Sequence, residues 1–511
     1  MMILTAFQQQ VPVGPTPLDE LGPLQLPQVE YSALMPALIL VVGALVILAV
    51  SAFVRRRPPP GTWALLSVLT AGAGLVSSFD LWRDVGDHGP KVAFAGAIYL
   101  DGFAVFFMVI ACTVVALGAL IADGYLRREG LDGPEYHVLA LLSASGAILM
   151  GAAGDLIVVF LGLEILSIAL YVLAAFHRRR AESAEAGIKY FVLGAFSSAF
   201  LLYGIALVYG ATGTTSLGGI AEYLAANVVR SNGILLAGMA FLLVGLAFKV
   251  AAVPFHTWTP DVYQGAPSPA TGFMAALAKA AGFAALLRVF FSTFETLRLD
   301  WQPLVWVLAV LTLVVGSVLA VVQSDVKRML AYSSVAHAGY VLIGLHASTP
   351  RGIAGSLFYV LAYAFMVLGT FAIVTMVGRR GDADHDIEAY RGLGTRRPGI
   401  ALAFTVFLLA QAGAPFTSGF LAKFYVISAA VEGQQYVLAL IAMLAAVAAA
   451  FVYLRVVVTM YAAPVGDDAP SIGRVPVALG AALVLTLAFT VLVGLVPGPV
   501  FDFAKAATPL F

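Results

Sequence analysis

Long apolar runs separated by short polar connections fill almost the whole chain. A helix needs about 20 apolar residues to span the hydrocarbon core of a bilayer, and fourteen segments have that length. We therefore expect an all-α membrane protein with about 14 transmembrane helices and almost no room for a separate soluble domain. The expected spans lie at 32–54, 63–82, 98–121, 135–153, 155–176, 185–210, 232–253, 267–294, 303–323, 328–348, 352–377, 398–431, 434–461 and 475–497.

Prolines mark the seventh, eighth and twelfth spans as irregular. A proline inside a helix removes a backbone hydrogen bond and clashes with the preceding turn, so we expect helices 7, 8 and 12 to be broken. Segments 250–255 and 411–416 end alike, in Val-Pro-Phe and Ala-Pro-Phe, and lie five spans apart. An odd offset predicts two halves that are inverted in the membrane. The helix-breaking prolines are Pro254, Pro260, Pro267 and Pro415.

Basic residues are distributed unevenly between alternate connections. One set of connections holds sixteen Lys and Arg residues and the other holds six. Because cytoplasmic connections carry the excess of positive charge, the first set is expected in the cytoplasm, and an even number of spans then leaves both termini outside. The richer set comprises Arg55–Arg57, Arg127–Arg128, Arg178–Arg180, Lys327–Arg328, Arg379, Arg380, Arg391, Arg396, Arg397 and Arg474.

Composition supports the membrane assignment and excludes several other classes. Of 511 residues, 61% are hydrophobic and only 11% are charged, with a net charge of zero. A soluble domain carries about 25% charged residues, and no basic excess indicates a nucleic-acid partner. The single cysteine, Cys112, excludes a disulfide framework and a cysteine-ligated metal site. No glycine-rich nucleotide loop or metal motif is present, so no flavin, nucleotide, haem or metal site is expected in this chain.

Charged residues inside the expected spans are the main functional signal. Each costs about 2.5–3.5 kcal/mol at a helix centre. Four of the seven lysines lie within spans, against only two of the 21 arginines. A buried lysine can lose its proton near neutral pH, whereas arginine stays protonated, so this bias favours proton loading and release over static pairing. The residues are Glu164, Lys189, Lys249, Lys279, Arg288, Lys423 and Arg455.

Glu164 and Lys249 are expected to be partners. Glu164 is the only carboxylate that the sequence places deep in a span, and one acid cannot neutralise four amines. At about 4 Å their attraction is about 4 kcal/mol, so moving Glu164 away would let Lys249 release its proton. His337 fits either a relay or a neutral histidine bonded to the backbone. Lys189, near a span end, is expected to reach the interface, and His256 to cap the break in span seven.

Four long motifs resemble the antiporter-like membrane subunits of respiratory complex I, the proton-pumping NADH:quinone oxidoreductase. They cover spans six to twelve. Within this family, the sequence VYQGAP at 262–267 favours the subunit N branch over subunits L and M. Lys423, in place of a glutamate, argues against subunit M. The motifs are KYFVLGAFSSAF at 189–200, VPFHTWTPDVYQGAP at 253–267, DVKRMLAYSSVAHAGY at 325–340 and GAPFTSGFLAKFY at 413–425.

The resemblance implies roles for five residues. Glu164 and Lys249 match the pair that responds to quinone chemistry elsewhere in the complex, and Lys279 matches the central relay lysine. His337 matches a connecting histidine, and Lys423 matches the terminal lysine that exchanges protons with the outer side. FMN, iron–sulfur clusters, NADH and quinone are then expected in partner subunits. The implied partners are sister antiporter-like subunits and the small hydrophobic subunits, in a bacterial plasma membrane.

The expected organisation has five parts, two of which are inverted five-helix repeats. Two alternatives stay open. A subunit of a multi-subunit sodium/proton antiporter shares the fold, although sodium handling favours more intramembrane carboxylates than one. A purely structural scaffold is disfavoured because it gains nothing from buried lysines. The parts are a polar extension (1–30), helices 1–3 (31–134), the first repeat (135–294), the second repeat (295–461), and the last helix with its tail (462–511).

Overall fold

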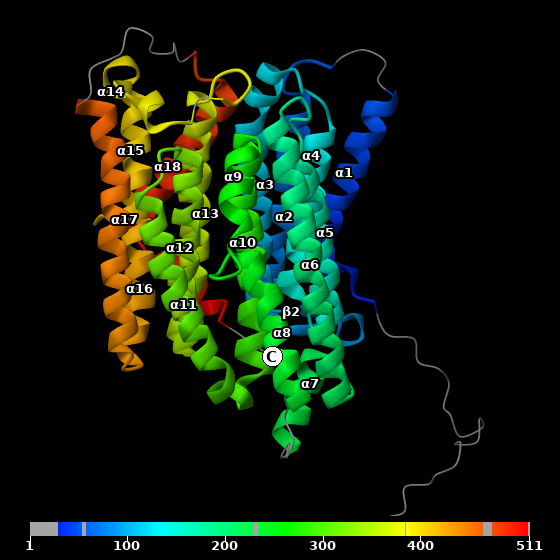
Figure 1. The fold of residues 1–511 in the computed structure, drawn as a ribbon. Helices are drawn as coiled ribbons and strands as arrows, with labels where there is room; N and C mark the ends of the chain where they lie inside the picture. The colour runs from blue at the N-terminus through cyan, green and yellow to red at the C-terminus, as the bar shows by residue number, and fades with distance from the viewer. Residues whose placement is uncertain (1–28, 54–57, 228–232, 384, 463–472, 509–511) are drawn as a thin grey trace, which may run out of the picture.

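The protein is a bundle of roughly antiparallel helices (Figure 1). The computed structural model describes residues 29–53, 58–227, 233–383, 385–462 and 473–508. The chain runs from α1–α6 on one side of the bundle, through α9 and α10 in the middle, to α11–α18 on the other side. The polar extension expected at 1–30 lies outside the described residues except for its last two.

The helices and strands have the following bounds. The α-helices are α1 (Met35–Phe53), α2 (Thr62–His88), α3 (Gly102–Glu129), α4 (Glu135–Ala152), α5 (Leu156–Ala174), α6 (Ala181–Thr212), α7 (Leu217–Ala226), α8 (Gly233–Val250), α9 (Trp258–Gly265), α10 (Ser268–Leu287), α11 (Arg298–Val321), α12 (Val326–Ala347), α13 (Pro350–Val377), α14 (Leu393–Arg396), α15 (Pro398–Ala412), α16 (Ser418–Glu432), α17 (Tyr436–Ala462), α18 (Val477–Leu495) and α19 (Gly498–Ala506). Two short antiparallel strands, β1 (Lys91–Ala93) and β2 (Ile98–Leu100), form a hairpin.

Each expected span corresponds to a helix or to a broken pair of helices. Twelve helices in the described residues are long and apolar enough to cross a membrane. The two remaining spans are α12 and the broken pair α15–α16. Helix α12 is more polar because it carries Lys327 and Arg328 in its first turn and several Ser, Tyr and His residues further along, nearly all of them buried. The all-helical membrane fold is therefore confirmed.

Two of the three irregular spans are interrupted as predicted. Helix α8 ends at Val250, and the chain follows a turn through 251–257 before α9 begins. The freed backbone is partly satisfied by other helices, since Val253 N donates to the Thr312 hydroxyl at 2.9 Å. The second break separates α15 from α16, where Gly413 adopts a φ of 95° that suits a residue without a Cβ.

The eighth span departs from its expected break. Helix α10 is continuous from Ser268 to Leu287, and its prolines lie at the start. Proline is tolerated in the first turn because the N–H it lacks has no intrahelical acceptor there. The irregularity is at the other end, where residues 288–293 form a π-helical turn. Pro260 likewise falls in the first turn of α9, so it begins that helix, while Pro254 and Pro415 lie in the two interruptions.

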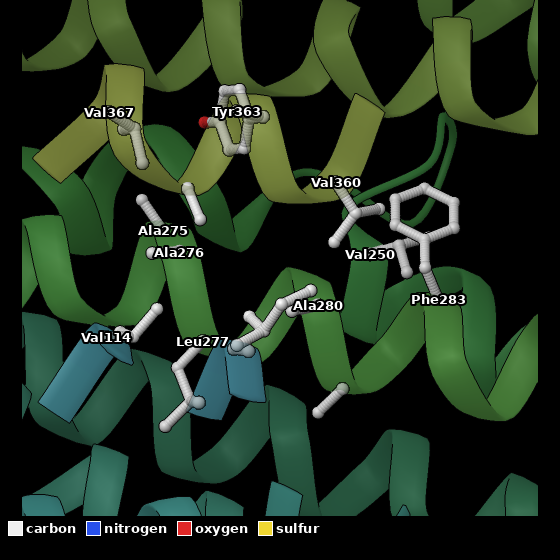
Figure 2. Close-up of a cluster of buried hydrophobic side chains, with 14 of the residues drawn as sticks. Val114, Val250, Ala275, Ala276, Leu277, Ala280, Phe283, Val360, Tyr363 and Val367 are labelled. Carbon is white, nitrogen blue, oxygen red and sulfur yellow. The ribbon is translucent and has the colours of Figure 1, made fainter. Parts of the chain in front are cut away.

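Helix α10 occupies the centre of the bundle and is wholly buried. It packs against α3, α4, α8 and α13. Figure 2 shows Ala276, Leu277 and Ala280 of α10 between Val114 of α3 and Tyr363 of α13. Peripheral helices such as α1, α6 and α18 bury only about a third of their apolar windows. The polar side chains of α10 are therefore enclosed by neighbouring helices.

The two sets of alternating connections lie at opposite ends of the bundle (Figure 1). The described connections of the arginine-rich set, including α14, lie at the upper end in this view. The β-hairpin and α7 lie at the lower end. This arrangement matches the alternation expected from fourteen spans. Which end faces the cytoplasm remains a prediction of the charge distribution.

Candidate functional site

Lys279 lies in the middle of α10 and is buried by its neighbours. Its ammonium Nζ makes a close hydrogen bond to the backbone carbonyl of Ser334 on α12. The same nitrogen lies 5.8 Å from the centre of the Tyr363 ring. A cavity of about 10 Å³ adjoins Lys279, His337 and Tyr363, which is about the space that one water needs.

Lys249 lies one residue before the end of α8 and is 2% exposed. Its Nζ donates to the hydroxyl of Ser167 on α5 at 2.7 Å. The same Nζ lies 5.5 Å from the centre of the Tyr190 ring and 5.9 Å from that of Tyr171. Another cavity of about 10 Å³ adjoins Lys249 and Ser167. The lysine is thus held by a hydroxyl and two aromatic faces.

Glu164 does not make the direct ion pair with Lys249 that we expected at about 4 Å. Glu164 lies one turn before Ser167 on the same helix, α5, and the shorter serine side chain makes the contact with the lysine. The Oε1 atom of Glu164 is enclosed and has no hydrogen-bond partner among the described residues. The serine, and not the glutamate, therefore contacts the ammonium of Lys249.

His337 connects hydroxyl groups from three helices. Its Nδ1 hydrogen-bonds with the Tyr359 hydroxyl of α13 at 2.7 Å, and its Nε2 lies 3.4 Å from the Tyr453 hydroxyl of α17. Tyr453 makes a close hydrogen bond with the Ser333 hydroxyl. Ser333 in turn donates to Oε1 of Gln411 at 3.5 Å. Among the described residues, His337 is therefore hydrogen-bonded to side chains of other helices and not to the helix backbone.

Lys423, on α16, lies at the far end of this network. Its Nζ donates to the backbone carbonyls of Gln411 at 2.9 Å and Ala412 at 2.8 Å. These carbonyls belong to the last turn of α15, where the broken helix leaves them without intrahelical partners. The ammonium also lies 4.9 Å from the centre of the Tyr340 ring. The break between α15 and α16 thus supplies the acceptors for Lys423.

The structure joins Lys279, His337 and Lys423 more closely than it joins Lys249 to Lys279. Between those two lysines, Tyr190 stacks on Trp258 with ring centres 4.5 Å apart. Trp258 is followed by Tyr263, whose hydroxyl lies 3.3 Å from the Ser334 hydroxyl. This stretch is mostly aromatic, whereas the stretch from His337 to Lys423 is lined by hydrogen-bonding groups.

The two accessory candidates lie outside this network. Lys189 is 42% exposed and makes ion pairs with Glu185 at 2.6 Å and Asp261 at 2.9 Å, at the mouth of a cavity of about 590 Å³. His256 lies in the turn between α8 and α9 with its ring 6.3 Å from that of Tyr332. Within the described part of the chain, neither residue has a hydrogen bond or an ion pair with Lys249, Lys279 or Lys423.

Buried carboxylates are more numerous than the sequence indicated. Asp101 makes a two-pronged ion pair with Arg288, both bonds 2.8 Å long, in the interior. Asp101 caps the start of α3, so it is a buried carboxylate at the end of a span, and Arg288 is its partner. Arg455 is also held structurally, because it donates to the carbonyl of Val321 at 2.9 Å. A helix-capping aspartate at a span end is the signal that points to Asp101.

Asp382, in the connection after α13, forms a second buried cluster. It is 0% exposed and pairs with Lys327 at 3.2 Å, His385 at 3.0 Å and Arg180 at 3.4 Å. It also accepts hydrogen bonds from the backbone N–H and hydroxyl of Ser268 at the start of α10. Burial alone raises the pKa of the Asp382 carboxyl, but Lys327, His385 and Ser268 outweigh burial and hold that pKa well below its usual range.

Sequence reasoning also missed the hydroxyl and amide groups of the network. Four buried tyrosines, Tyr263, Tyr359, Tyr363 and Tyr453, lie among these groups. Tyr359 and Tyr363 could have been recognised by their position in the middle of a span, on α13, whereas Tyr263 lies on the short helix α9 outside the expected spans and Tyr453 lies on the more exposed α17. The missed residues are Ser167, Tyr263, Ser333, Ser334, Tyr359, Tyr363, Gln411 and Tyr453.

Comparisons with known proteins agree with this geometry. The family model described as NADH:quinone oxidoreductase/Mrp antiporter, TM, matches residues 153–449. A curated relative from Trichlorobacter lovleyi, named NADH-quinone oxidoreductase subunit N, is 45% identical over 94% of this chain and 98% of the relative. A chain of respiratory complex I from Thermus thermophilus is 32% identical over 92% of this chain and 100% of that chain, with a TM-score of 0.77.

A chain of the Mrp complex from Dietzia sp. has a TM-score of 0.82 over 93% of this chain and 96% of that chain, at 21% identity. That likeness shows the shared fold alone, so the shape of the bundle does not separate the two groups of proteins. Sequence identity does separate the two groups, because the relative named subunit N is 45% identical along nearly the full length of both chains. The chain therefore belongs to the subunit N family of NADH-quinone oxidoreductase, the antiporter-like membrane subunits of respiratory complex I.

Proposed function

We propose that this chain moves protons across the bacterial plasma membrane, as the N subunit of complex I, through a relay formed by Glu164, Lys249, Lys279, His337 and Lys423. The observation that carries the proposal is the set of hydrogen-bonded side chains from His337 through Tyr453 and Ser333 to Gln411, whose backbone carbonyl accepts a hydrogen bond from Lys423. Polar groups at this depth are costly. A structural subunit would have no use for a row of them.

Each group in the network suits proton transfer. Tyrosine and serine hydroxyls both donate and accept hydrogen bonds, and a neutral histidine carries one donor and one acceptor. A proton can therefore pass from His337 through Tyr453 to Ser333 when the hydroxyls reorient. Gln411 accepts a hydrogen bond from Ser333 through its side chain and one from Lys423 through its backbone carbonyl, so it orients both groups at the end of the route. The cavity shared by Lys279 and His337 has room for about one water, which would close the gap between them.

Backbone carbonyls hold the two lysines nearest the network. Lys279 and Lys423 both donate to carbonyl oxygens, and neither makes an ion pair among the described residues. A carbonyl orients the amine without the full attraction of a carboxylate. In this arrangement each lysine can be loaded with a proton and can also release it.

Glu164 is placed to govern the other end of the relay. Its charge reaches Lys249 across Ser167, so a displacement of Glu164 changes how strongly Lys249 holds its proton. No bond between them has to break. This placement supports the proposal that events elsewhere in the complex drive the relay electrostatically.

The remaining parts of the proposal follow from the family. The redox groups (FMN, iron–sulfur clusters, NADH and quinone) belong to partner subunits. The partners are the sister antiporter-like subunits and the small hydrophobic subunits. The arginine-rich end of the bundle faces the cytoplasm and both termini lie outside. The repeats comprise 135–294 and 295–461, supported by the two similar interruptions after α8 and α15.

The test of this function is proton pumping by the assembled complex. In inverted membrane vesicles, Lys279→Met is expected to abolish most NADH-driven proton uptake while the complex still assembles. Lys505→Met serves as the matched control, since Lys505 is an exposed lysine on α19. Normal pumping by Lys279→Met would refute the relay.

Membership in the complex is tested separately. The tagged chain is purified from its own membrane in mild detergent, and the proteins that accompany it are identified by mass spectrometry. Flavin- and iron–sulfur-bearing subunits with NADH oxidation activity are expected. Recovery with only small hydrophobic subunits, and sodium-dependent proton exchange, would support the cation/proton antiporter instead.

A further inference from the structure

Gln411, in the last turn of α15, is buried and bonds to three different helices. Its side-chain nitrogen Nε2 donates to the Thr370 hydroxyl of α13 at 2.6 Å, and its Oε1 accepts from the Ser333 hydroxyl of α12 at 3.5 Å. Its backbone carbonyl accepts from Lys423 of α16. An amide has donors on one side and an acceptor on the other, so its orientation decides whether each neighbour must donate or accept.

Thr370 determines which way this amide faces. Its hydroxyl has a single hydrogen, which it donates to the backbone carbonyl of Met366 at 2.8 Å. A carbonyl can only accept, so the Thr370 oxygen is left as an acceptor for the Nε2 of Gln411. The Oε1 of Gln411 then faces Ser333. A reversed amide would place two acceptors together unless Thr370 gave up its bond to Met366.

The hydrogen bonds between Gln411 and His337 then have one direction. Ser333 donates its single hydroxyl hydrogen to Gln411, so it accepts from the Tyr453 hydroxyl in their close contact. Tyr453 has then used its own hydrogen, so its oxygen accepts from Nε2 of His337 at 3.4 Å. A neutral imidazole carries one hydrogen, which is therefore on Nε2. The other nitrogen, Nδ1, accepts from the Tyr359 hydroxyl at 2.7 Å.

This tautomer presents the free acceptor of His337 to the group that meets Lys279. Tyr359 and His337 both line the cavity of about 10 Å³ that adjoins Lys279, and the cavity has room for about one water. A proton released by Lys279 can pass through that water and the Tyr359 hydroxyl to Nδ1, which leaves a neutral amine and an imidazolium. In the other tautomer Nδ1 already carries a hydrogen and cannot accept one.

We propose that Gln411, held by Thr370, is a positioning residue that keeps neutral His337 in the tautomer that accepts protons from the side of Lys279. Gln411 acts through Ser333 and Tyr453 and transfers no proton itself. The inference rests on the proposed relay, because it concerns the resting state of one relay member. If His337 changed tautomer, the intervening hydroxyls would turn and leave Oε1 of Gln411 unpaired in the interior, and this cost holds the tautomer in place.

Variants of Thr370 in the assembled complex test the proposal. Thr370→Val keeps the shape but removes the hydroxyl, so Gln411 can turn, and NADH-driven proton uptake in inverted vesicles should fall about fivefold. Thr370→Ser keeps the hydroxyl and should recover most of that loss. The matched control is Thr375→Val, which removes a buried hydroxyl that donates to the Phe371 carbonyl of the same helix; it should leave pumping unchanged.

Gln411→Met removes the amide and should also slow pumping about fivefold. Adding Thr370→Val to Gln411→Met should cause no further loss, because the threonine acts through the glutamine. The two single variants alter the same amide independently, so either one is sufficient if the other fails to assemble. Additive losses in the double variant, or wild-type pumping by the single variants, would overturn the proposal.

The solvent isotope effect distinguishes positioning from a structural defect. A smaller fraction of intact complexes lowers the rate equally in H2O and D2O, whereas slower proton transfer to His337 should raise the ratio of the two rates above its wild-type value. An unchanged ratio in Thr370→Val would refute the positioning role. Tyr453→Phe separates this failure from failure of the relay, since normal pumping by Tyr453→Phe refutes the relay itself. Slow pumping by Tyr453→Phe with normal pumping by Thr370→Val refutes only the role of Gln411.

Discussion

At the scale of single residues, the hydrogen-bond partners of the three buried lysines are the main functional feature. Lys279 and Lys423 are bonded to carbonyls, and Lys249 to a serine hydroxyl. These partners orient an amine but do not cancel its charge. A carboxylate in the same place would keep the proton on the lysine, since opposite charges within a few ångströms favour the charged form.

Replacing Lys279 with arginine separates a titrating lysine from a static charge. Lys279→Arg keeps the positive charge but cannot release a proton, so proton pumping by the assembled complex should fall about tenfold or more. The measurement is NADH-driven proton uptake in inverted vesicles. Lys505→Arg on α19 is the control, and full activity in Lys279→Arg would mean that charge alone suffices.

The Tyr453 hydroxyl is predicted to carry protons between His337 and Ser333. Tyr453→Phe removes that oxygen and leaves the ring in place, so pumping should slow about tenfold with little change in assembly. Tyr436→Phe, an exposed position at the start of the same helix, should leave the rate unchanged. Proton uptake at limiting NADH measures both variants.

At the scale of helices, the interruptions after α8 and α15 position two of the buried lysines. The end of α15 exposes the carbonyls that bind Lys423, and the turn after α8 places Lys249 at the last residue but one of its helix. An unbroken helix would satisfy those carbonyls internally. The break after α15 therefore leaves the carbonyls of Gln411 and Ala412 as acceptors inside the bundle, where only protein or enclosed water can satisfy them.

Gly413→Ala tests the second interruption. Gly413 has a φ of 95°, and an added Cβ would lie 3.1 Å from Cδ of Lys423. The left-handed conformation costs a residue with a Cβ roughly 1–2 kcal/mol, so the melting temperature of the complex should fall and pumping should decrease. Gly399→Ala, at a site with no atom within 4 Å of the added Cβ, should change neither. Scanning calorimetry and proton uptake provide the two readouts.

Asp382 links distant helices at the scale of the whole molecule. Its carboxylate contacts Arg180 before α6, Ser268 at the start of α10 and Lys327 on α12. All three helices help to form the site. Removing one partner from a buried ion pair costs about 3–5 kcal/mol, so Asp382→Asn should lower the stability of the complex by about 3 kcal/mol at neutral pH.

The stabilisation by Asp382 should also depend on pH. Its pKa in the folded protein lies below the value of about 3.9 in an unfolded chain. The stabilisation is therefore complete above pH 5 or so, and it is lost as the pH falls through the lower, folded-state pKa. The melting-temperature difference between wild type and Asp382→Asn should shrink on acidification below about pH 4. Asp386→Asn, at an exposed neighbouring position, should show no such difference.

Most of the architecture could be predicted from the sequence because it depends on local chemistry. Apolar runs of about 20 residues define spans wherever they occur, and proline disrupts a helix through its own backbone. The spans, two of the three breaks and the buried positions of Lys249, Lys279 and Lys423 follow from such local rules. The eighth span was the exception, because a proline either breaks or begins a helix according to where the helix starts.

The tertiary structure alone decided which side chains meet. Lys249 and Ser167 are 82 residues apart, and Ser333 and Tyr453 are 120 apart. The sequence determined that four lysines and one glutamate would lie in membrane spans. Packing placed Ser167 against Lys249 in place of Glu164, paired Asp101 with Arg288, and brought hydroxyl groups from α13 and α17 to His337. Such contacts depend on how helices turn and cross one another, and the pattern along one chain does not encode distances between faces of different helices.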